Sequence, residues 1–310
     1  MGTPEFSVPA LRSVASRCDV VLVVTQPDRP RGRGLQPAAS AVAVVAAELG
    51  VPVLKPADMK APEVCRQLAA VGADLFAVVA FGAILTPEVL ALPRLGCINL
   101  HGSLLPEYRG ASPVQRALWD GLNETGVSTI FMDAGIDTGD IVLTARTAIL
   151  DNDDAATLAA RLAELGGPLL ADSLVLEHEG RAPRQQQDRS AGSYAKKLKK
   201  ADGAVDWALS ARTVWNRARA VTPWPGATAG YQGKRVLLQQ TEPISAVPGG
   251  TPGEVLGVDA DGIRVSCGEG ALLLKRLKPE GRAGLLAADW ARGARLHAGE
   301  RFEHGKELLS

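Results

Sequence analysis

The sequence lacks the long apolar segments that mark membrane and secreted proteins. Its longest nearly apolar stretch, residues 75–85, is much shorter than the roughly 20 residues that a bilayer-spanning helix needs. The N-terminus shows no basic segment followed by an apolar one, which argues against a secretory signal. We therefore expect a cytoplasmic protein with no membrane partner.

Cysteine is scarce, and no two cysteines form a Cys-x-x-Cys pair. The four residues are Cys18, Cys65, Cys97 and Cys267, whose wide spacing suggests neither a disulfide framework nor a zinc site. Because free cysteines are usually buried, we expect four reduced and mostly buried thiols. No metal site is predicted.

The chain also has no surplus of charge of one sign. It contains 34 Lys+Arg and 34 Asp+Glu residues, so its formal net charge is +0. The overall field therefore does not attract a polyanion. Any binding of a nucleic acid has to depend on local basic clusters.

The sequence does have the length and composition for two hydrophobic cores. It contains 310 residues, of which 46% are hydrophobic and 22% charged, as in a globular protein. We expect a first domain over residues 1–180, a basic linker over 181–203 and a second domain over 204–310. The linker is marked by seven basic residues, one acidic residue and three consecutive glutamines within residues 181–200, which suggests an exposed connection.

The first 150 residues alternate β-branched runs with Ala/Leu-rich stretches, which predicts an α/β domain with a mostly parallel sheet. The expected strands are 20–25, 51–54, 75–80, 97–100, 127–132 and 141–145, and the expected helices are 39–49, 61–71 and 157–179, with two more beginning at Thr86-Pro87 and Ser112-Pro113. Beyond residue 203, short strands at 235–239, 253–258, 262–267 and 270–274 alternate with Gly/Pro/Asp turns. They predict an all-β module, which we interpret as a small barrel.

Polar side chains gather at the end of the strand 97–100. Asn99 and His101 are two residues apart, so their side chains should face the same side, and open α/β sheets bind ligands at the carboxyl ends of strands. The glycine-bearing loop 133–140 carries Asp137, which we expect within hydrogen-bond reach of His101. Each feature alone is usually structural, but together they favour a functional site, although they do not identify a reaction. The residues themselves suggest no more than acyl or one-carbon transfer by an acid/base imidazole, an amide donor and a carboxylate.

Two runs at this place carry a family resemblance. They are Asn99-x-His101-x-Ser103-Leu104-Leu105-Pro106 and Asp133-x-Gly135-x-Asp137-Thr138-Gly139, which resemble the hallmarks of formyltetrahydrofolate-dependent formyltransferases. Further runs resemble the methionyl-tRNA formyltransferases within that superfamily: Gly-Thr-Pro-Glu-Phe at 2–6, Thr-Gln-Pro-Asp-Arg-Pro at 25–30, Gly-Arg-Gly at 32–34, Val-Asp-Trp at 205–207 and Pro-Trp-Pro-Gly-Ala at 223–227. The matches span almost the whole chain in the family's order.

The resemblance implies a Rossmann-like catalytic domain, a linker and an OB-like β-barrel that binds tRNA. It also implies 10-formyltetrahydrofolate as the donor co-substrate and initiator methionyl-tRNA as the acceptor, for a monomeric enzyme of translation initiation. By the family's pattern Asn99, His101 and Asp137 are catalytic, and Ser103, Leu104, Leu105 and Pro106 line the folate site.

These roles suit the chemistry of formyl transfer. The methionyl α-amine, whose pKa is about 8 when the amine is free in water, has to be neutral to attack the formyl carbon, and the tetrahedral intermediate carries an oxyanion. Asn99 and a protonated His101 are natural donors to that oxygen. Asp137 would favour the imidazolium and accept the proton that the amine loses.

Two basic segments are candidates for contact with tRNA. Arg29, Arg31 and Arg33 lie in a Pro/Gly-rich loop after a strand, which is either a solvated loop or, following the family, a loop that enters the acceptor stem with Arg33 as its best candidate. In the linker, Lys196, Lys197, Lys199 and Lys200 would contact phosphates, which position RNA without reading its sequence.

One departure from the family concerns the first strand. The family carries a hydrophobic strand before Gly-Thr-Pro, and Met1 stands where that strand should end. We expect the sheet to lack this strand, which would cost more than a domain's usual margin of about 5 to 15 kcal/mol, and the natural protein to begin several residues upstream.

Other functions stay open at this point. A formyltransferase acting on an amino-sugar nucleotide shares the catalytic runs, although the arginine loop and the runs at 205–207 and 223–227 speak against it. A tRNA-binding protein without activity is a second alternative. A dehydrogenase is disfavoured because no Gly-x-Gly-x-x-Gly motif follows a predicted strand.

Overall fold

The computed structural model of the chain describes residues 1–31, 36–188, 190–244 and 250–308. The chain divides into two compact units. The first unit comprises Met1–Pro113, Glu124–Ala148 and Ala159–Ala195, and the second comprises Val114–Asn123, Ile149–Leu158 and Lys196–Ser310.

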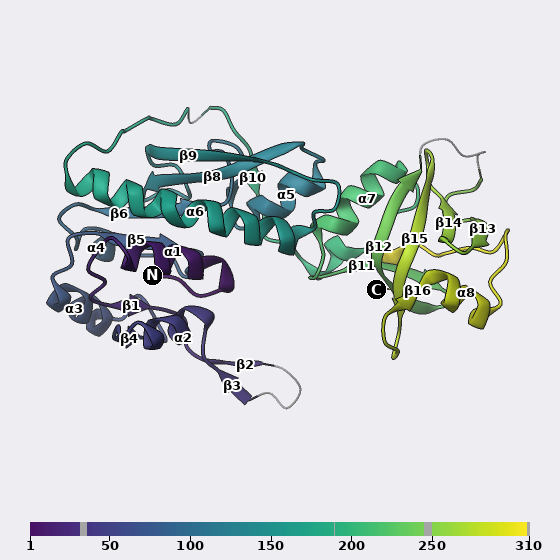
Figure 1. Cartoon of the computed structure of the whole chain (residues 1–310), viewed down its shortest axis with the longest axis horizontal. Coiled ribbons are helices and arrows are strands. Elements are labelled where there is room, and N and C mark those ends of the chain that lie inside the picture. Colours follow the sequence, from purple (N-terminus) through teal and green to yellow (C-terminus); the bar gives the residue numbers. More distant parts are fainter. Residues whose placement is uncertain (32–35, 189, 245–249, 309–310) are drawn as a thin grey trace. The chain divides into compact units, whose positions relative to one another are not determined.

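The first unit is an α/β domain (Figure 1). Its strands are β1 (Val23–Val24), β2 (Arg29–Arg31), β3 (Gln36–Ala38), β4 (Val53–Leu54), β5 (Phe76–Val79), β6 (Cys97–His101), β7 (Arg109–Gly110), β8 (Glu124–Phe131), β9 (Ile141–Ala148) and β10 (Tyr194–Ala195). Its helical segments are η1 (Glu5–Ser7), α1 (Val8–Ala15), α2 (Ala41–Glu48), α3 (Pro62–Val71), α4 (Pro87–Leu90) and most of α6 (Ala155–His178). Every strand and helix predicted for the first domain is present, with shifted ends.

The main sheet of this unit is mixed rather than mostly parallel. Its order is β5-β6-β8-β9, in which β5 and β6 are parallel and the other neighbours are antiparallel. The expectation of a mostly parallel sheet is therefore wrong for these four strands. Strands β8 and β9 flank the 133–140 loop as a hairpin, and strands joined by so short a loop have to be antiparallel.

A separate parallel pair is formed by β1 and β4. The backbones of Met1 and Gly2 hydrogen-bond to both β1 and β5. Within the described residues no strand lies between β1 and β5. A largely apolar cavity of about 580 Å³ is lined there by β1, β5, α1 and α6.

Helix α6 packs closely on the sheet and on α1 because two of its residues are glycines. A Cβ at Gly166 would lie 2.6 Å from Leu100 Cδ2 in β6, and one at Gly167 would lie 2.9 Å from Pro9 O in α1. The Ser173 and Thr129 hydroxyls, 2.7 Å apart, join α6 to β8 in the interior. No helix in the described part of the chain is both long and apolar enough to cross a bilayer.

The second unit is rich in strands but is not all-β. It contains β11 (Ala227–Tyr231), β12 (Lys234–Ile244), β13 (Val255–Asp259), β14 (Gly262–Ser266), β15 (Ala271–Pro279) and β16 (Leu285–Leu286), with most of α5 (Pro113–Trp119), α7 (Ala211–Ala220), α8 (Ala287–Ala294), η2 (Lys200–Gly203) and η3 (Gly305–Leu308). The sheet order is β11-β12-β15-β14-β13, with β16 beside β15, and among the described strands the sheet does not close into a barrel. The predictions of an all-β module and of a barrel are thus corrected to a strand-rich unit that includes helices.

Aromatic side chains form the centre of the second unit's core. Trp207 and Phe302 are fully buried, and Phe302 also lies within 6.0 Å of Trp290 and 5.5 Å of Tyr231, measured between ring centroids. Such rings bury large apolar areas and prefer tilted contacts at these distances. Trp207 belongs to the Val-Asp-Trp run, so this motif has a structural role in the core.

The cysteines are free thiols. Cys97 and Cys267 are buried, as expected, and burial raises the pKa of each to about 12. Both thiols therefore stay protonated near neutral pH. Cys18 and Cys65 are only half-buried, so the expectation of burial holds for two of the four.

Candidate active site

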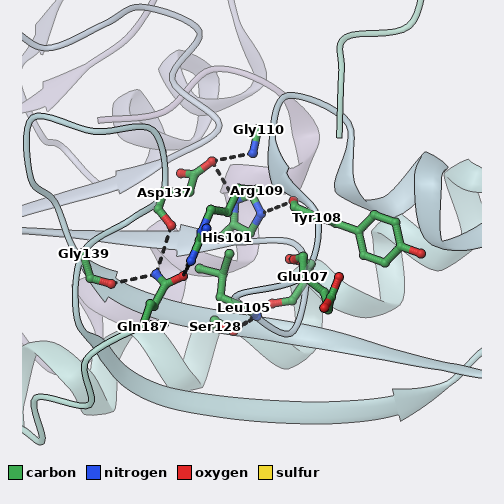
Figure 2. Close-up of polar contacts among 11 residues, drawn as sticks. His101, Leu105, Glu107, Tyr108, Arg109, Gly110, Ser128, Asp137, Gly139 and Gln187 are labelled. Carbon is green, nitrogen blue, oxygen red and sulfur yellow. Dashed lines mark hydrogen bonds and ion pairs between the residues drawn. The ribbon is translucent and has the colours of Figure 1, made fainter. Parts of the chain in front are cut away.

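His101 and Asp137 meet at the carboxyl end of β6, as Figure 2 shows. The His101 ring is only 6% exposed, and its Nδ1 lies 3.5 Å from Asp137 Oδ2. On the other side of the ring, Nε2 lies 2.9 Å from the Tyr108 carbonyl oxygen. A carbonyl only accepts, so Nε2 carries the hydrogen of this bond.

The Asp137 side chain is held from one side only. Its Oδ2 accepts a hydrogen bond of 2.8 Å from Gly110 N in β7. Its Oδ1 has no partner among the residues that the structure describes, and the side chain is 19% exposed. One carboxylate oxygen is thus fixed beside the imidazole, and the other has no hydrogen-bond partner among the described residues.

The loop that carries Asp137 is shaped by Asp133. Asp133 Oδ1 accepts from Gly135 N at 2.9 Å and from Thr138 Oγ1 at 2.8 Å. A Cβ at Gly139 would lie 1.8 Å from Phe131 O, so only glycine fits there. The residue spacing of this motif therefore has a local structural cause, which is the folding of a tight loop between β8 and β9.

Asn99 lies in β6, two residues before His101, and is half-buried. Alternate residues of a strand face the same side, so its amide projects from the same face of β6 as the imidazole. Among the described residues, its side chain has no hydrogen-bond partner. The amide N–H groups are therefore available to a bound oxygen atom.

The run predicted to line the folate site forms the loop after β6. Ser103 is fully buried, with its hydroxyl donating to Glu107 O, and Ser128 Oγ bridges the loop by donating to Ser103 O and accepting from Leu105 N. Leu105 is buried, and Leu104 and Pro106 are half-buried. Ser103 and Leu105 thus stabilise the loop itself, and Leu104 and Pro106 are partly accessible.

The predicted tRNA contacts are spread over both units. Arg29 and Arg31 lie in β2, where the exposed Arg29 donates to Gln26, and Arg33 lies outside the described residues. The linker lysines belong to the second unit, and all four are exposed around the buried Leu198: Lys196, Lys197, Lys199 and Lys200.

Sequence reasoning missed two side chains beside Asp137, those of Arg109 and Gln187. Gln187, from the stretch expected to be an exposed connection, is only 8% exposed and contacts the Asp137 loop and Arg109 (Figure 2). Arg109 lies three residues after Pro106, and this closeness to the motif was the feature of the sequence that could have identified it. Nothing in the local sequence distinguishes Gln187 from its two glutamine neighbours.

Comparison with known proteins agrees with this geometry. A family model described as Formyl transferase matches residues 5–174, and one described as Formyl transferase, C-terminal domain, matches residues 197–295. The methionyl-tRNA formyltransferase of Citrifermentans bemidjiense is 44% identical over 300 residues, which cover 96% of this chain and 94% of the relative. That of Geobacter metallireducens is 44% identical over 305 residues, covering 98% and 97%.

A solved structure shares the fold. The N-formyltransferase of Helicobacter canadensis, in complex with folinic acid and dTDP-3-aminofucose, matches with a TM-score of 0.65 at 16% identity, covering 88% of this chain and 96% of that one. At this identity the likeness concerns the fold alone. The two family models and the relatives at 44% identity over nearly the full length show that the chain belongs to the methionyl-tRNA formyltransferase family.

Proposed function

We propose that the chain transfers the formyl group of 10-formyltetrahydrofolate to the α-amino group of methionyl initiator tRNA at a centre formed by Asn99, His101 and Asp137. The observation that carries this proposal is the 3.5 Å approach of His101 Nδ1 to Asp137 Oδ2 at the end of β6. The neutral amine attacks the formyl carbon, the carbonyl oxygen becomes an oxyanion, and the bond to the folate nitrogen then breaks.

Each side chain has a role that fits its surroundings. Asp137 Oδ1 accepts the proton that the attacking amine loses, and that proton is returned to the departing folate nitrogen. His101 Nδ1 lies 3.5 Å from Asp137 Oδ2 without a hydrogen bond to it, and it donates to the oxyanion because Nε2 is engaged with the Tyr108 carbonyl. The Asn99 amide donates to the same oxygen.

The remaining parts bind the two substrates. In this proposal the first unit is the Rossmann-like catalytic domain, and the 103–106 loop contacts the folate. The strand-rich second unit binds the tRNA. Arg29, Arg31, Arg33 and the four linker lysines contact the RNA backbone.

The formylation reaction itself tests the acceptor. Purified protein incubated with labelled 10-formyltetrahydrofolate and charged initiator tRNA should give formyl-methionine on the tRNA, released and identified after base treatment. A dTDP-amino sugar should give no product under the same conditions, because so small an acceptor does not reach the basic segments that we expect to bind the tRNA backbone. Formylation of the sugar and not of the tRNA would overturn the proposed acceptor.

Binding of tRNA should depend steeply on salt. Each phosphate neutralised by a lysine or arginine contributes about −0.7 to −0.9 to the slope of log affinity against log salt concentration. If the four linker lysines each contact one phosphate, a fourfold rise in salt weakens their part of the binding roughly 100-fold. Filter binding of Lys196→Gln, with Lys60→Gln at an exposed position of the first unit as the control, measures the slope. An unchanged slope in Lys196→Gln would exclude that contact.

A further inference from the structure

Residues 187–188 and 190–195 pack along the loop that follows His101. Arg109 N donates to Ser193 O at 2.9 Å, Ala111 N donates to Ala195 O at 2.9 Å, and β7 and β10 pair in parallel. The Arg109 side chain also reaches this segment, with Nη2 donating to Asp188 O at 3.1 Å. Residues 187–188 and 190–195 are therefore part of the wall of the site.

The Gln187 amide, at the start of this segment, uses its full hydrogen-bonding capacity. Its Oε1 accepts from Arg109 Nε at 3.0 Å and from Arg109 Nη2 at 2.9 Å. Its Nε2 donates to Asp137 O at 2.9 Å and to Gly139 O at 2.7 Å. Figure 2 shows the amide between the Arg109 guanidinium and the backbone of the Asp137 loop.

The orientation of this amide has one solution. A guanidinium only donates and the two carbonyl oxygens only accept, so Oε1 has to face Arg109 and Nε2 has to face Asp137 and Gly139. Arg109 thus fixes the amide, and the amide fixes two carbonyl groups of the loop. Because Gln187 is nearly buried, water has little access to replace these bonds.

The loop needs such a restraint at Asp137. Asp137 has a φ of 55°, in the left-handed region. Aspartate and asparagine enter this region more readily than most non-glycine residues, but a single fixed left-handed conformation still depends on its surroundings. Gln187 Nε2 bonds to the carbonyl of this same residue. Releasing that carbonyl would let the backbone relax and carry the carboxylate away from His101.

We infer that Gln187 is a positioning residue for formyl transfer, which holds Asp137 in its left-handed conformation so that the carboxylate faces His101 and the attacking amine. The inference rests on the proposed catalytic role of Asp137. Gln187 itself touches neither the reacting atoms nor the imidazole, so its effect has to pass through Asp137.

Gln187→Met tests the inference, since methionine has a similar length and no amide. A misplacement of a reacting group by about 1 Å costs up to about 100-fold in rate, so kcat should fall about 10- to 100-fold with little change in KM for either substrate. The matched control is Gln186→Met, an exposed neighbour, whose kcat should stay at the wild-type value. Gln187→Glu is a second variant, which keeps an acceptor for Arg109 and loses both N–H donors. If circular dichroism shows that Gln187→Met does not fold, the kcat of Gln187→Glu tests the inference instead.

A double-mutant cycle separates positioning from general damage. In an Asp137→Asn background, single-turnover rates should show no further loss from Gln187→Met, because the group being positioned is already disabled. An equal loss in both backgrounds would overturn the inference while leaving Asp137 catalytic. Normal turnover in Asp137→Asn alone would instead remove Asp137 from the proposed mechanism, and the inference would fall with it.

Discussion

Asp137→Asn is expected to lower kcat by roughly 10²- to 10⁴-fold, the range usual for loss of a general acid–base group, while the protein stays folded. Asparagine has nearly the same shape as aspartate but has no negative charge and does not accept a proton near neutral pH. The amine proton would then have to go to water. His101 would also lose the carboxylate 3.5 Å from its Nδ1.

Folding should survive this substitution for a local reason. Gly110 N donates to Asp137 Oδ2, and the amide oxygen of asparagine accepts the same bond. Asparagine is also among the non-glycine residues that tolerate a positive φ. The melting temperature of Asp137→Asn should therefore lie close to that of the wild type.

Asp140→Asn is the matched control, being the same change three residues later in the same loop. Steady-state formylation and thermal melting of both variants make the measurement. A large loss of kcat in Asp140→Asn would point to damage of the loop, and near-normal turnover in Asp137→Asn would remove Asp137 from the mechanism.

Much of the α/β fold was predictable because its signals are local. Thr86 accepts a hydrogen bond from Val89 N and Pro87 is the first residue of α4, as the Thr-Pro pair predicts. Strands β5 and β6 are short buried apolar runs that sequence alone reveals. Their direction relative to β8 depends on pairing between distant segments, which no local pattern encodes.

Helices α7 and α8 of the second unit were missed, although α7 has readable signals. Ser210 caps α7 by accepting from Thr213 N, and Val214, Trp215 and Ala218 are buried at helical spacing. The many glycines and prolines of the surrounding segments favoured strands and turns and outweighed this short pattern. Composition over a long window is a poor guide to a ten-residue helix inside it.

The meeting of His101 and Asp137 was predictable, but its detailed geometry was not. Residue spacing and the family motif brought the imidazole and the carboxylate together in advance. The Tyr108 carbonyl that engages His101 Nε2 is placed by the turn of the following loop, where Tyr108 itself has a φ of 58°. The role of Gln187 depends on contacts 50 residues away in sequence, which pattern reasoning does not reach.

Asn99→Ala is expected to lower kcat by about 10²- to 10³-fold, which corresponds to about 2.7 to 4 kcal/mol of transition-state stabilisation. The Asn99 amide has no partner within the described residues, so its N–H groups are free to bind the oxygen that becomes negative. That bond strengthens as the charge develops, which lowers the barrier more than it stabilises the bound substrate. KM should therefore change little.

Asn99→Asp sharpens the test, because it keeps the size of the side chain in β6 and replaces the donor by a negative charge. If Asn99 stabilises an oxyanion, the aspartate variant has to lose at least as much kcat as the alanine variant, since a carboxylate repels that oxygen. If Asn99 merely fills space, the aspartate variant should be the more active of the two. Asn152→Ala, at an exposed position, is the control for both. Steady-state rates of the four proteins, wild type included, separate the two explanations by the order of their kcat values.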